Sequence, residues 1–173
     1  MPATANELLA LGQGRFDQSD QALAEAALAR VWGAVRDHCE WHVTPVKRET
    51  LVVDGTGGPI LQLPTLRLVE VYEVRENGEV LDPSAVQWSA DGSLRKSSGR
   101  WSDRWRGIEV DVEHGYASVD GLDGLVLRAA ARELTTPAGQ TRLRVGQTDE
   151  QFDAAFLASE LELLGRYRLG TTG

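Results

Sequence analysis

The sequence predicts an α+β fold: a small helical bundle with an inserted antiparallel β region. Apolar residues recur at helical spacing towards both ends of the chain, whereas short runs of valine, leucine and isoleucine separated by glycine turns fill residues 49–114. The chain has 173 residues and neither an internal repeat nor a low-complexity linker. We therefore expect a single domain, with the helical body at about 5–45 and 117–165, the β insert at about 49–114 and a C-terminal docking tail at 166–173.

The first long helix is expected to start at Ser19 or Asp20, either of which is a suitable N-cap, and to end at Cys39. A short apolar cluster around Leu8 precedes it and ends at Gly12. The many alanines of the first long helix give that helix a narrow profile, which permits close packing against neighbours, including other copies of the chain. The stripe predicted to face the core consists of Leu23, Ala27, Leu28, Val31, Trp32 and Val35.

Three hairpins and a final strand are expected in the β insert. The first pairs residues 50–54 with residues 60–63 across the glycine-rich turn at 55–59. The second turns at Asn77-Gly78, between a strand at 66–74 and a return at Val80, and the third turns at Asp91-Gly92. The final strand, 108–113, alternates apolar and acidic residues, so one face is predicted to be buried and the other to carry carboxylates.

Two helices are expected after the insert. One starts near Asp120 or Asp123 and runs to Pro137, followed by a loop over 137–147. The last helix is expected to open with a capping box at Thr148 to Gln151 and to end at Gly165. Its predicted buried residues are Phe152, Phe156, Leu157, Leu161 and Leu164.

Composition excludes several classes of function. The formal net charge of −8 and the pI of about 4.9 provide no global positive field for nucleic acid or anionic lipid. The single cysteine, Cys39, excludes an intramolecular disulfide and is expected to be a small apolar helix residue. With no signal-peptide pattern and no stretch apolar enough to span a bilayer, we expect no membrane partner and retention in the cytoplasm unless the protein leaves inside a larger particle.

No motif supplies a recognisable catalytic set. His38 and His42 flank Glu40 at a helix end, but a zinc site needs a third ligand, so we expect no metal. The glycines at 55–58 precede a proline and a strand rather than the helix of a phosphate-binding loop, so we expect no cofactor. The acidic pairs Asp111/Glu113 and Glu160/Glu162 are typical of solvated faces. We predict that the chain is not an enzyme; a small hydrolase or metal enzyme using these histidines and acidic pairs is the third hypothesis.

One basic and aromatic patch stands out in this acidic chain, at residues 88–106. Tryptophan and arginine are enriched at protein contacts, and the same pair can stack on and neutralise nucleic acid. We favour a protein contact; the second reading of the patch is ordinary surface with aromatic packing, and the third is nucleic acid. A nucleic-acid-binding module that uses this patch is nevertheless the second hypothesis for the function of the chain. Its members are Trp88, Arg95, Lys96, Arg100, Trp101, Arg104, Trp105 and Arg106.

The order of these parts resembles the head-to-tail adaptor (head–tail connector) proteins of long-tailed bacteriophages, particularly those of actinobacteriophages. Five segments carry the resemblance, which covers about residues 20–169 and rests on turn and core residues rather than on a catalytic signature. They are Cys39-Glu40-Trp41-His42-Val43-Thr44-Pro45, Val53-Asp54-Gly55 to Leu63-Pro64, Trp88-Ser89-Ala90-Asp91-Gly92, His114-Gly115-Tyr116 and Glu162-Leu163-Leu164-Gly165-Arg166-Tyr167-Arg168-Leu169.

The resemblance implies a structural virion protein: a ring of twelve copies that binds the portal at the capsid vertex and continues the DNA channel towards the tail. Its partners would be the portal protein, further copies of itself and a tail-side stopper or terminator protein, with genomic DNA passing through unbound. We expect it at the head–tail joint of the virion, and in the host cytoplasm during assembly. The segment matching the family's portal-docking region is a flexible tail of Arg166, Tyr167, Arg168 and Leu169, and our candidates for contacts between copies are Trp32, Arg36, Trp101 and Trp105.

Overall fold

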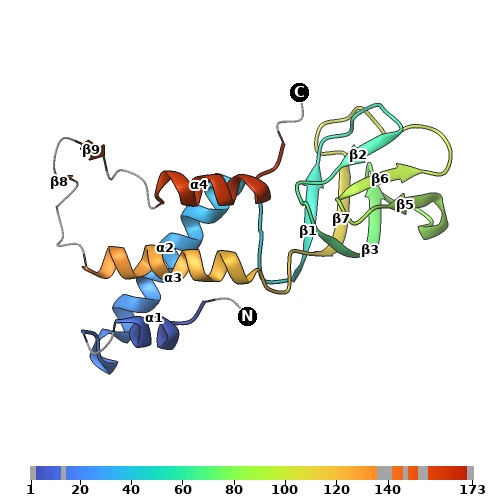
Figure 1. Cartoon of the computed structure of the whole chain (residues 1–173). Helices are drawn as coiled ribbons and strands as arrows, with labels where there is room; N and C mark the ends of the chain where they lie inside the picture. Colours follow the sequence, from blue (N-terminus) through green and yellow to red (C-terminus); the bar gives the residue numbers. More distant parts are fainter. Residues whose placement is uncertain (1–2, 13–14, 136–141, 146–147, 152–155, 171–173) are drawn as a thin grey trace. The chain divides into compact units, whose positions relative to one another are not determined.

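Figure 1 shows the computed structural model of the chain, which describes residues 3–12, 15–135, 142–145, 148–151 and 156–170. The chain divides into two compact units. The helical unit comprises Met1–Cys39 and Ser118–Arg168, and the β unit comprises Glu40–Ala117 and Leu169–Gly173. Helices and antiparallel sheets confirm the predicted α+β class, and the strands of the β unit run from Lys47 to His114.

The described residues of the helical unit form four α-helices: α1 (Ala5–Leu11), α2 (Gln21–Cys39), α3 (Asp120–Thr135) and α4 (Ala158–Leu164). The start of α2 differs from the prediction. Asp17 is the N-cap of a 3-10 turn, Gln18–Asp20, that leads into α2, and its carboxylate accepts a hydrogen bond from the Ser19 N–H at 2.7 Å. Ser19 and Asp20 are therefore inside the turn rather than capping it. No helix in the described ranges is both long and apolar enough to cross a bilayer.

The stripe predicted on α2 is buried except at Leu23 and at Trp32, which is half-buried. Ala27, Leu28, Val31 and Val35 are buried, whereas Leu23 is 59% exposed. Leu23 lies in the first turn of α2, where the described residues of α1 and α3 do not cover it. The buried apolar residues that α1 and α3 contribute are Leu8, Leu122, Leu125, Val126, Ala129 and Ala130.

The region after α3 is the largest departure from the predicted secondary structure. Residues expected to be loop and helix form two short antiparallel strands, β8 (Arg142–Val145) and β9 (Thr148–Gln151). Arg142–Val145 alternates polar and apolar residues, which is a β period, and the short link to Thr148 favours a hairpin over a capping box. The last helix therefore begins at Ala158. Of its predicted core, Phe156 and Leu164 are buried, Leu161 is half-buried, Leu157 is exposed, and Phe152 lies outside the described residues.

The β unit holds two antiparallel sheets. The larger has the order β1-β7-β3-β4, from strands β1 (Lys47–Val53), β3 (Leu68–Glu76), β4 (Glu79–Val80) and β7 (Ile108–His114). The smaller has the order β2-β6-β5, from strands β2 (Ile60–Gln62), β5 (Val86–Trp88) and β6 (Ser93–Lys96). A 3-10 turn at Pro83–Ala85 links β4 to β5. The hairpins predicted at Asn77-Gly78 and at Asp91-Gly92 are confirmed.

The predicted pairing of residues 50–54 with residues 60–63 is wrong. Strand β1 pairs with β7 over its whole length, whereas β2 pairs with β6 in the other sheet. The intervening loop instead bonds to residues 101–104: the Gly55 N–H donates to Arg104 O at 2.9 Å, and the Gly57 N–H donates to Ser102 O at 3.0 Å. The Trp101 N–H donates to Gly58 O at 2.8 Å. These bonds satisfy the loop backbone, so its glycines join two sheets rather than two strands of one hairpin.

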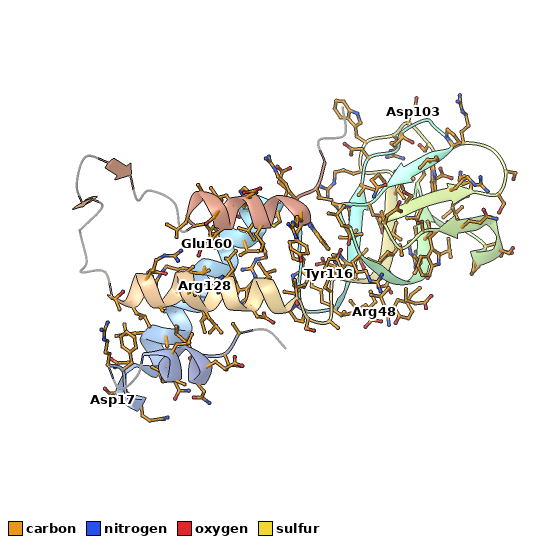
Figure 2. The ribbon with its side chains drawn as sticks, viewed as in Figure 1. Asp17, Arg48, Asp103, Tyr116, Arg128 and Glu160 are labelled. Atoms are coloured by element: carbon orange, nitrogen blue, oxygen red, sulfur yellow. The ribbon has the colours of Figure 1, made fainter. Side chains whose placement is uncertain are left out.

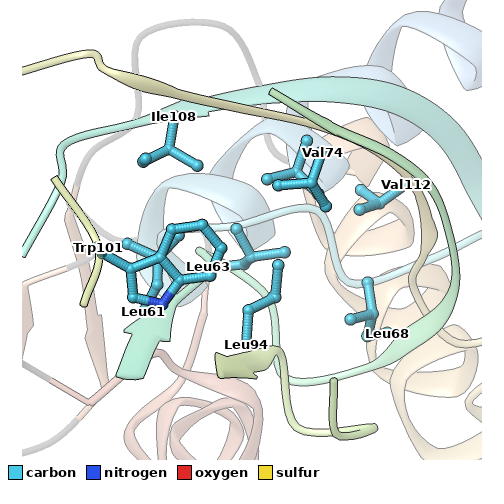
Figure 3. Close-up of a cluster of buried hydrophobic side chains, with 9 residues drawn as sticks. Leu61, Leu63, Leu68, Val74, Leu94, Trp101, Ile108 and Val112 are labelled. Atoms are coloured by element: carbon cyan, nitrogen blue, oxygen red, sulfur yellow. The ribbon is translucent and has the colours of Figure 1, made fainter. Parts of the chain in front are cut away.

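The two sheets of the β unit enclose one apolar cluster (Figure 3). The alternation predicted for β7 is confirmed, because Ile108, Val110 and Val112 are buried and Glu109 is exposed. The remaining members of the cluster come from both sheets and from the segment before β7: Leu61, Leu63, Leu68, Val74, Leu94 and Trp101.

Two glycine-to-alanine substitutions should change stability in opposite directions. A Cβ on Gly55 would lie 2.0 Å from Ser102 O, whereas one on Gly33 in α2 would meet nothing within 4 Å outside its helix. We expect Gly55→Ala to lower the free energy of unfolding by about 2 kcal/mol or more, because backbone must shift to make room. Gly33→Ala should raise it by about 0.5–1 kcal/mol through helix propensity. Urea unfolding of both variants, followed by circular dichroism, measures the difference; a neutral Gly55→Ala would contradict the packed loop.

Candidate assembly surfaces

The C-terminal segment continues the last helix instead of leaving it as a flexible tail. Gly165 ends α4, and Gly165–Tyr167 form a 3-10 turn. Arg166 and Arg168 are exposed, whereas Tyr167 and Leu169 are half-buried by the chain itself. The start of this segment is therefore ordered in the unbound chain. The final residues, 171–173, lie outside the described residues.

Leu169 and Gly170 belong to the β unit, where they line a groove of about 710 Å³. Val52, Leu63 and Leu66 supply much of its apolar wall, and Asp54, Asp91 and Arg106 lie among its polar residues. Both carboxylates already serve as structural acceptors: Asp54 binds the Arg106 N–H at 2.6 Å, and Asp91 binds the Ser93 N–H at 3.0 Å. The groove thus holds apolar surface and turn-capping groups rather than a paired acid and base.

An ion pair between α3 and α4 fixes the helix that carries the C-terminal segment. The carboxylate of Glu160, which is only 7% exposed, accepts two hydrogen bonds from Arg132, at 2.9 and 2.5 Å. It also accepts the Leu157 N–H at 2.9 Å. Burial raises the pKa of Glu160, but these bonds and the positive charges of Arg132 and Arg128 outweigh burial and lower it below its usual value. Figure 2 labels Glu160 and Arg128 on the facing helices.

Cys39 makes the contact between α2 and α4. Its side chain is fully buried, and the thiol lies 3.9 Å from Leu164 O, as a weak hydrogen-bond donor. Burial raises the pKa of the thiol to about 11. The expectation of a small, unreactive helix residue is therefore supported by its surroundings.

The structure separates the four residues predicted to contact other copies. Trp32 is half-buried on α2, and Arg36 is exposed one turn later. Trp101 is only 2% exposed because its indole fills the core of the β unit, so it does not contribute to the surface. Trp105, by contrast, is 84% exposed. The basic and aromatic patch predicted at 88–106 is therefore not continuous; within it, Lys96 forms an ion pair with Glu76 at 2.5 Å.

Trp105 lies in a turn that hydrogen bonds fix to neighbouring segments. This turn comprises residues 102–107, and we call it the Trp105 turn. The Ser102 N–H donates to the Glu76 carboxylate at 2.7 Å, and the Asn77 N–H donates to Gly107 O at 2.7 Å. Arg106 adopts a φ of 52°, a left-handed conformation that its N–H bond to Asp54 stabilises. The turn is therefore preorganised, and little backbone entropy would be lost if a partner covered Trp105.

The outer face of the larger sheet is charged and internally paired. Arg48 on β1 makes two hydrogen bonds to Asp111 on β7, at 3.1 and 2.5 Å, and its guanidinium lies 3.9 Å from the centre of the Tyr72 ring. The Tyr72 hydroxyl donates to Glu113 at 3.0 Å. The acidic pairs Asp111/Glu113 and Glu160/Glu162 are thus engaged in ion pairs or hydrogen bonds through at least one member each, which fits the solvated or structural reading better than catalysis.

The histidines do not assemble a metal site among the described residues, where no group of three or more potential ligands converges. Helix α2 ends at Cys39, and the His42 ring contacts Pro45 O beyond it. Burial lowers the pKa of His42. His114, only 1% exposed, hydrogen-bonds to Glu49 at 2.7 Å. The predicted final strand ends at residue 113, which leaves out His114 and this bond; the position of His114 at the end of an apolar–acidic alternation was the signal for a buried side chain.

Solved structures share this fold, although no family model and no curated protein sequence matches the chain. A chain from the neck of an empty gene transfer agent (GTA) particle, computed with C6 symmetry, aligns with a TM-score of 0.61 and 14% identity over 98% of this chain and 90% of that one. The neck of a native GTA particle, computed with C12 symmetry, gives 0.58 and 15% over 100% and 94%. The virion of a native GTA gives 0.66 and 16% over 98% and 89%. At these identities the likeness establishes the fold.

The Arg132–Glu160 pair predicts an acid-sensitive contribution to stability. Because the pKa of Glu160 is lowered from 4.5 in the folded chain, the pair contributes fully above that pH and its contribution is lost as the pH falls through the folded value. We expect Arg132→Ala to lower the free energy of unfolding by about 2–4 kcal/mol at pH 7, since it leaves a buried carboxylate unpaired.

The matched control is Arg30→Ala, which breaks the exposed pair between Arg30 on α2 and Glu133 on α3, the helix that also carries Arg132, and should cost under about 1 kcal/mol. Urea unfolding at pH 7 and at pH 3 measures both variants. An Arg132→Ala deficit that is no larger than that of Arg30→Ala, or that persists undiminished at pH 3, would contradict this account.

Proposed function

We propose that this chain is a structural virion protein without catalytic activity, forming a homo-oligomeric ring in the neck of a phage-like particle. The observation that carries the proposal is its fold, which matches chains of the neck and virion of gene transfer agents over 98–100% of its length. Those necks were computed with C6 and C12 symmetry. A twelvefold ring, as in the actinobacteriophage adaptors that the sequence resembles, is the copy number we propose.

Within this ring we assign portal docking to Arg166, Tyr167, Arg168 and Leu169. The two arginines are exposed and suit acidic groups of a partner, while Tyr167 and Leu169 offer apolar surface beside them. Arg166 and Tyr167 lie in a 3-10 turn that follows α4, and the contacts of α4 with α2 and α3 support this assignment by giving the turn a fixed base. Trp32 and Arg36 on α2 are the proposed contacts of the helical unit with a neighbouring copy. A tail-side stopper or terminator protein would cover the opposite rim, at the head–tail joint.

Co-purification with the portal tests this role. The full chain, mixed with the portal protein of the same particle, should form a complex in which electron microscopy shows a ring. Truncation after Gly165 should leave the circular dichroism spectrum largely unchanged and abolish the complex. Tyr167→Ala and Leu169→Ala should each weaken binding by about 1–3 kcal/mol, measured by calorimetry, if they are buried anchors.

The matched control is Val80→Ala on β4, which removes a more accessible apolar side chain, 54% exposed, from the β unit. It should bind as the unaltered chain does. A truncated chain that still co-purifies at the same stoichiometry would reject the assigned docking segment, and an unaltered chain that never binds portal would reject the function itself.

Genomic DNA is proposed to pass through the ring without being held. The charge of −8 disfavours phosphate contacts. The nucleic-acid-binding alternative relied on three tryptophans among basic residues, and one of them, Trp101, is buried. We therefore expect no gel shift of double- or single-stranded DNA at low micromolar protein and physiological salt. A salt-sensitive shift under those conditions would favour the alternative.

A further inference from the structure

The Trp105 turn presents two arginines beside an uncovered aromatic ring, and they outnumber its one carboxylate, that of the exposed Asp103. Arg104 and Arg106 are both exposed, and neither guanidinium has an ion-pair partner among the residues that the structure describes. Trp105 between them has the highest exposure of the large apolar side chains described. A fixed turn with this composition is typical of the central anchor of a protein interface.

A complementary surface lies elsewhere on the same β unit, which we call the Tyr72 patch: Val69, Glu70, Tyr72 and Glu113. Val69 and Tyr72 are 39% and 45% exposed, so the patch offers apolar area. Arg48 beside the patch forms an ion pair with Asp111 at 2.5 Å, so its positive charge is already compensated. The carboxylates of Glu70 and Glu113 therefore give the patch a net negative charge. The patch is therefore apolar and acidic where the turn is apolar and basic.

The two surfaces lie at opposite ends of the larger sheet. The Trp105 turn leads directly into the first residue of β7, Ile108, whereas Glu113 pairs with Glu70 near the last residue of that strand. Ile108 and Glu113 are five residue steps apart along the strand, roughly 17 Å. Figure 2 shows the same separation within the β unit, with Asp103 of the turn at one end and Arg48, which stacks on Tyr72, at the other.

We propose that the Trp105 turn of one copy binds the Tyr72 patch of the next. This inference rests on the proposed ring, because a closed ring needs two different surfaces on every chain that fit each other. Opposite placement on one unit suits such a head-to-tail contact. A twofold contact of the turn with itself would bring four arginines together and is disfavoured by like-charge repulsion.

Charge reversal tests the pairing. We expect Arg104→Glu with Arg106→Glu, and separately Glu70→Arg with Glu113→Arg, each to weaken self-association by about tenfold or more in sedimentation experiments on the full chain. Combining all four substitutions should restore association to within about threefold of the unaltered chain, because the pairs are exchanged rather than lost. Failure of the four-fold variant to recover, with circular dichroism showing it folded, would overturn the proposal.

Disulfide trapping locates the contact directly. Two single variants, Trp105→Cys and Glu70→Cys, are mixed and oxidised, once in the absence of the portal protein and once bound to it. We expect disulfide-linked dimers that contain one copy of each variant, in clear excess over dimers of either variant with itself. The control mixes Trp105→Cys with Val80→Cys on β4. No excess of mixed dimers in either setting would overturn the contact.

The two proposals fail differently. If the ring forms on the portal but reversal of the turn charges leaves it unchanged, only this contact is wrong; if no ring forms at all, the proposed function is wrong. A Trp105→Ala variant that keeps full self-association but loses binding to a DNA oligonucleotide would assign the turn to nucleic acid and overturn the inference.

Discussion

The β unit depends on hydrogen bonds that join its two chain ends. Lys47 and His114 are partners at the base of the β1–β7 ladder, and beyond them the Tyr116 N–H donates to Val43 O at 2.8 Å. The Gly115 N–H donates to Arg67 O, also at 2.8 Å. Because β7 pairs with β1 on one side and β3 on the other, these bonds at its end add to the buried face of β7 in setting its register against both neighbours. The insert can therefore fold as a closed body within a helical chain.

Aromatic and titratable side chains reinforce this closure. The ring of Trp41, itself buried, lies 6.1 Å from that of Tyr116 and 6.3 Å from that of His114, measured between centroids. Burial raises the pKa of Glu49, but hydrogen bonds with Lys47 and His114 outweigh burial and lower it. Both surfaces proposed to join neighbouring copies lie on the sheet that this closure holds in register. Rigid surfaces of that kind favour assembly, because little ordering remains to be done on binding.

Sequence reasoning succeeded where structure is locally determined. Period-2 alternation located β7, Asn77-Gly78 located the β3–β4 turn, and helical spacing located α2 and α3, because each signal acts between residues close in the chain. Sequence reasoning failed where backbone hydrogen bonds join segments that are far apart in the chain. The 55–59 loop bonds to residues 101–104, some forty residues away, and no pattern near Gly55 reveals that. For the candidate surfaces, residue type alone could not separate Trp101 in the core from Trp105 on the surface, since both lie in one short basic stretch.

The burial of Cys39 has a practical consequence. It is the sole cysteine, and its thiol lies against Leu164 O of α4. A thiol with a pKa of about 11 is almost entirely protonated at neutral pH, so an alkylating reagent reacts with it only when the surrounding helices open. The unaltered chain therefore carries a built-in probe of local unfolding. The rate at which the thiol is modified reports how often α4 separates from α2.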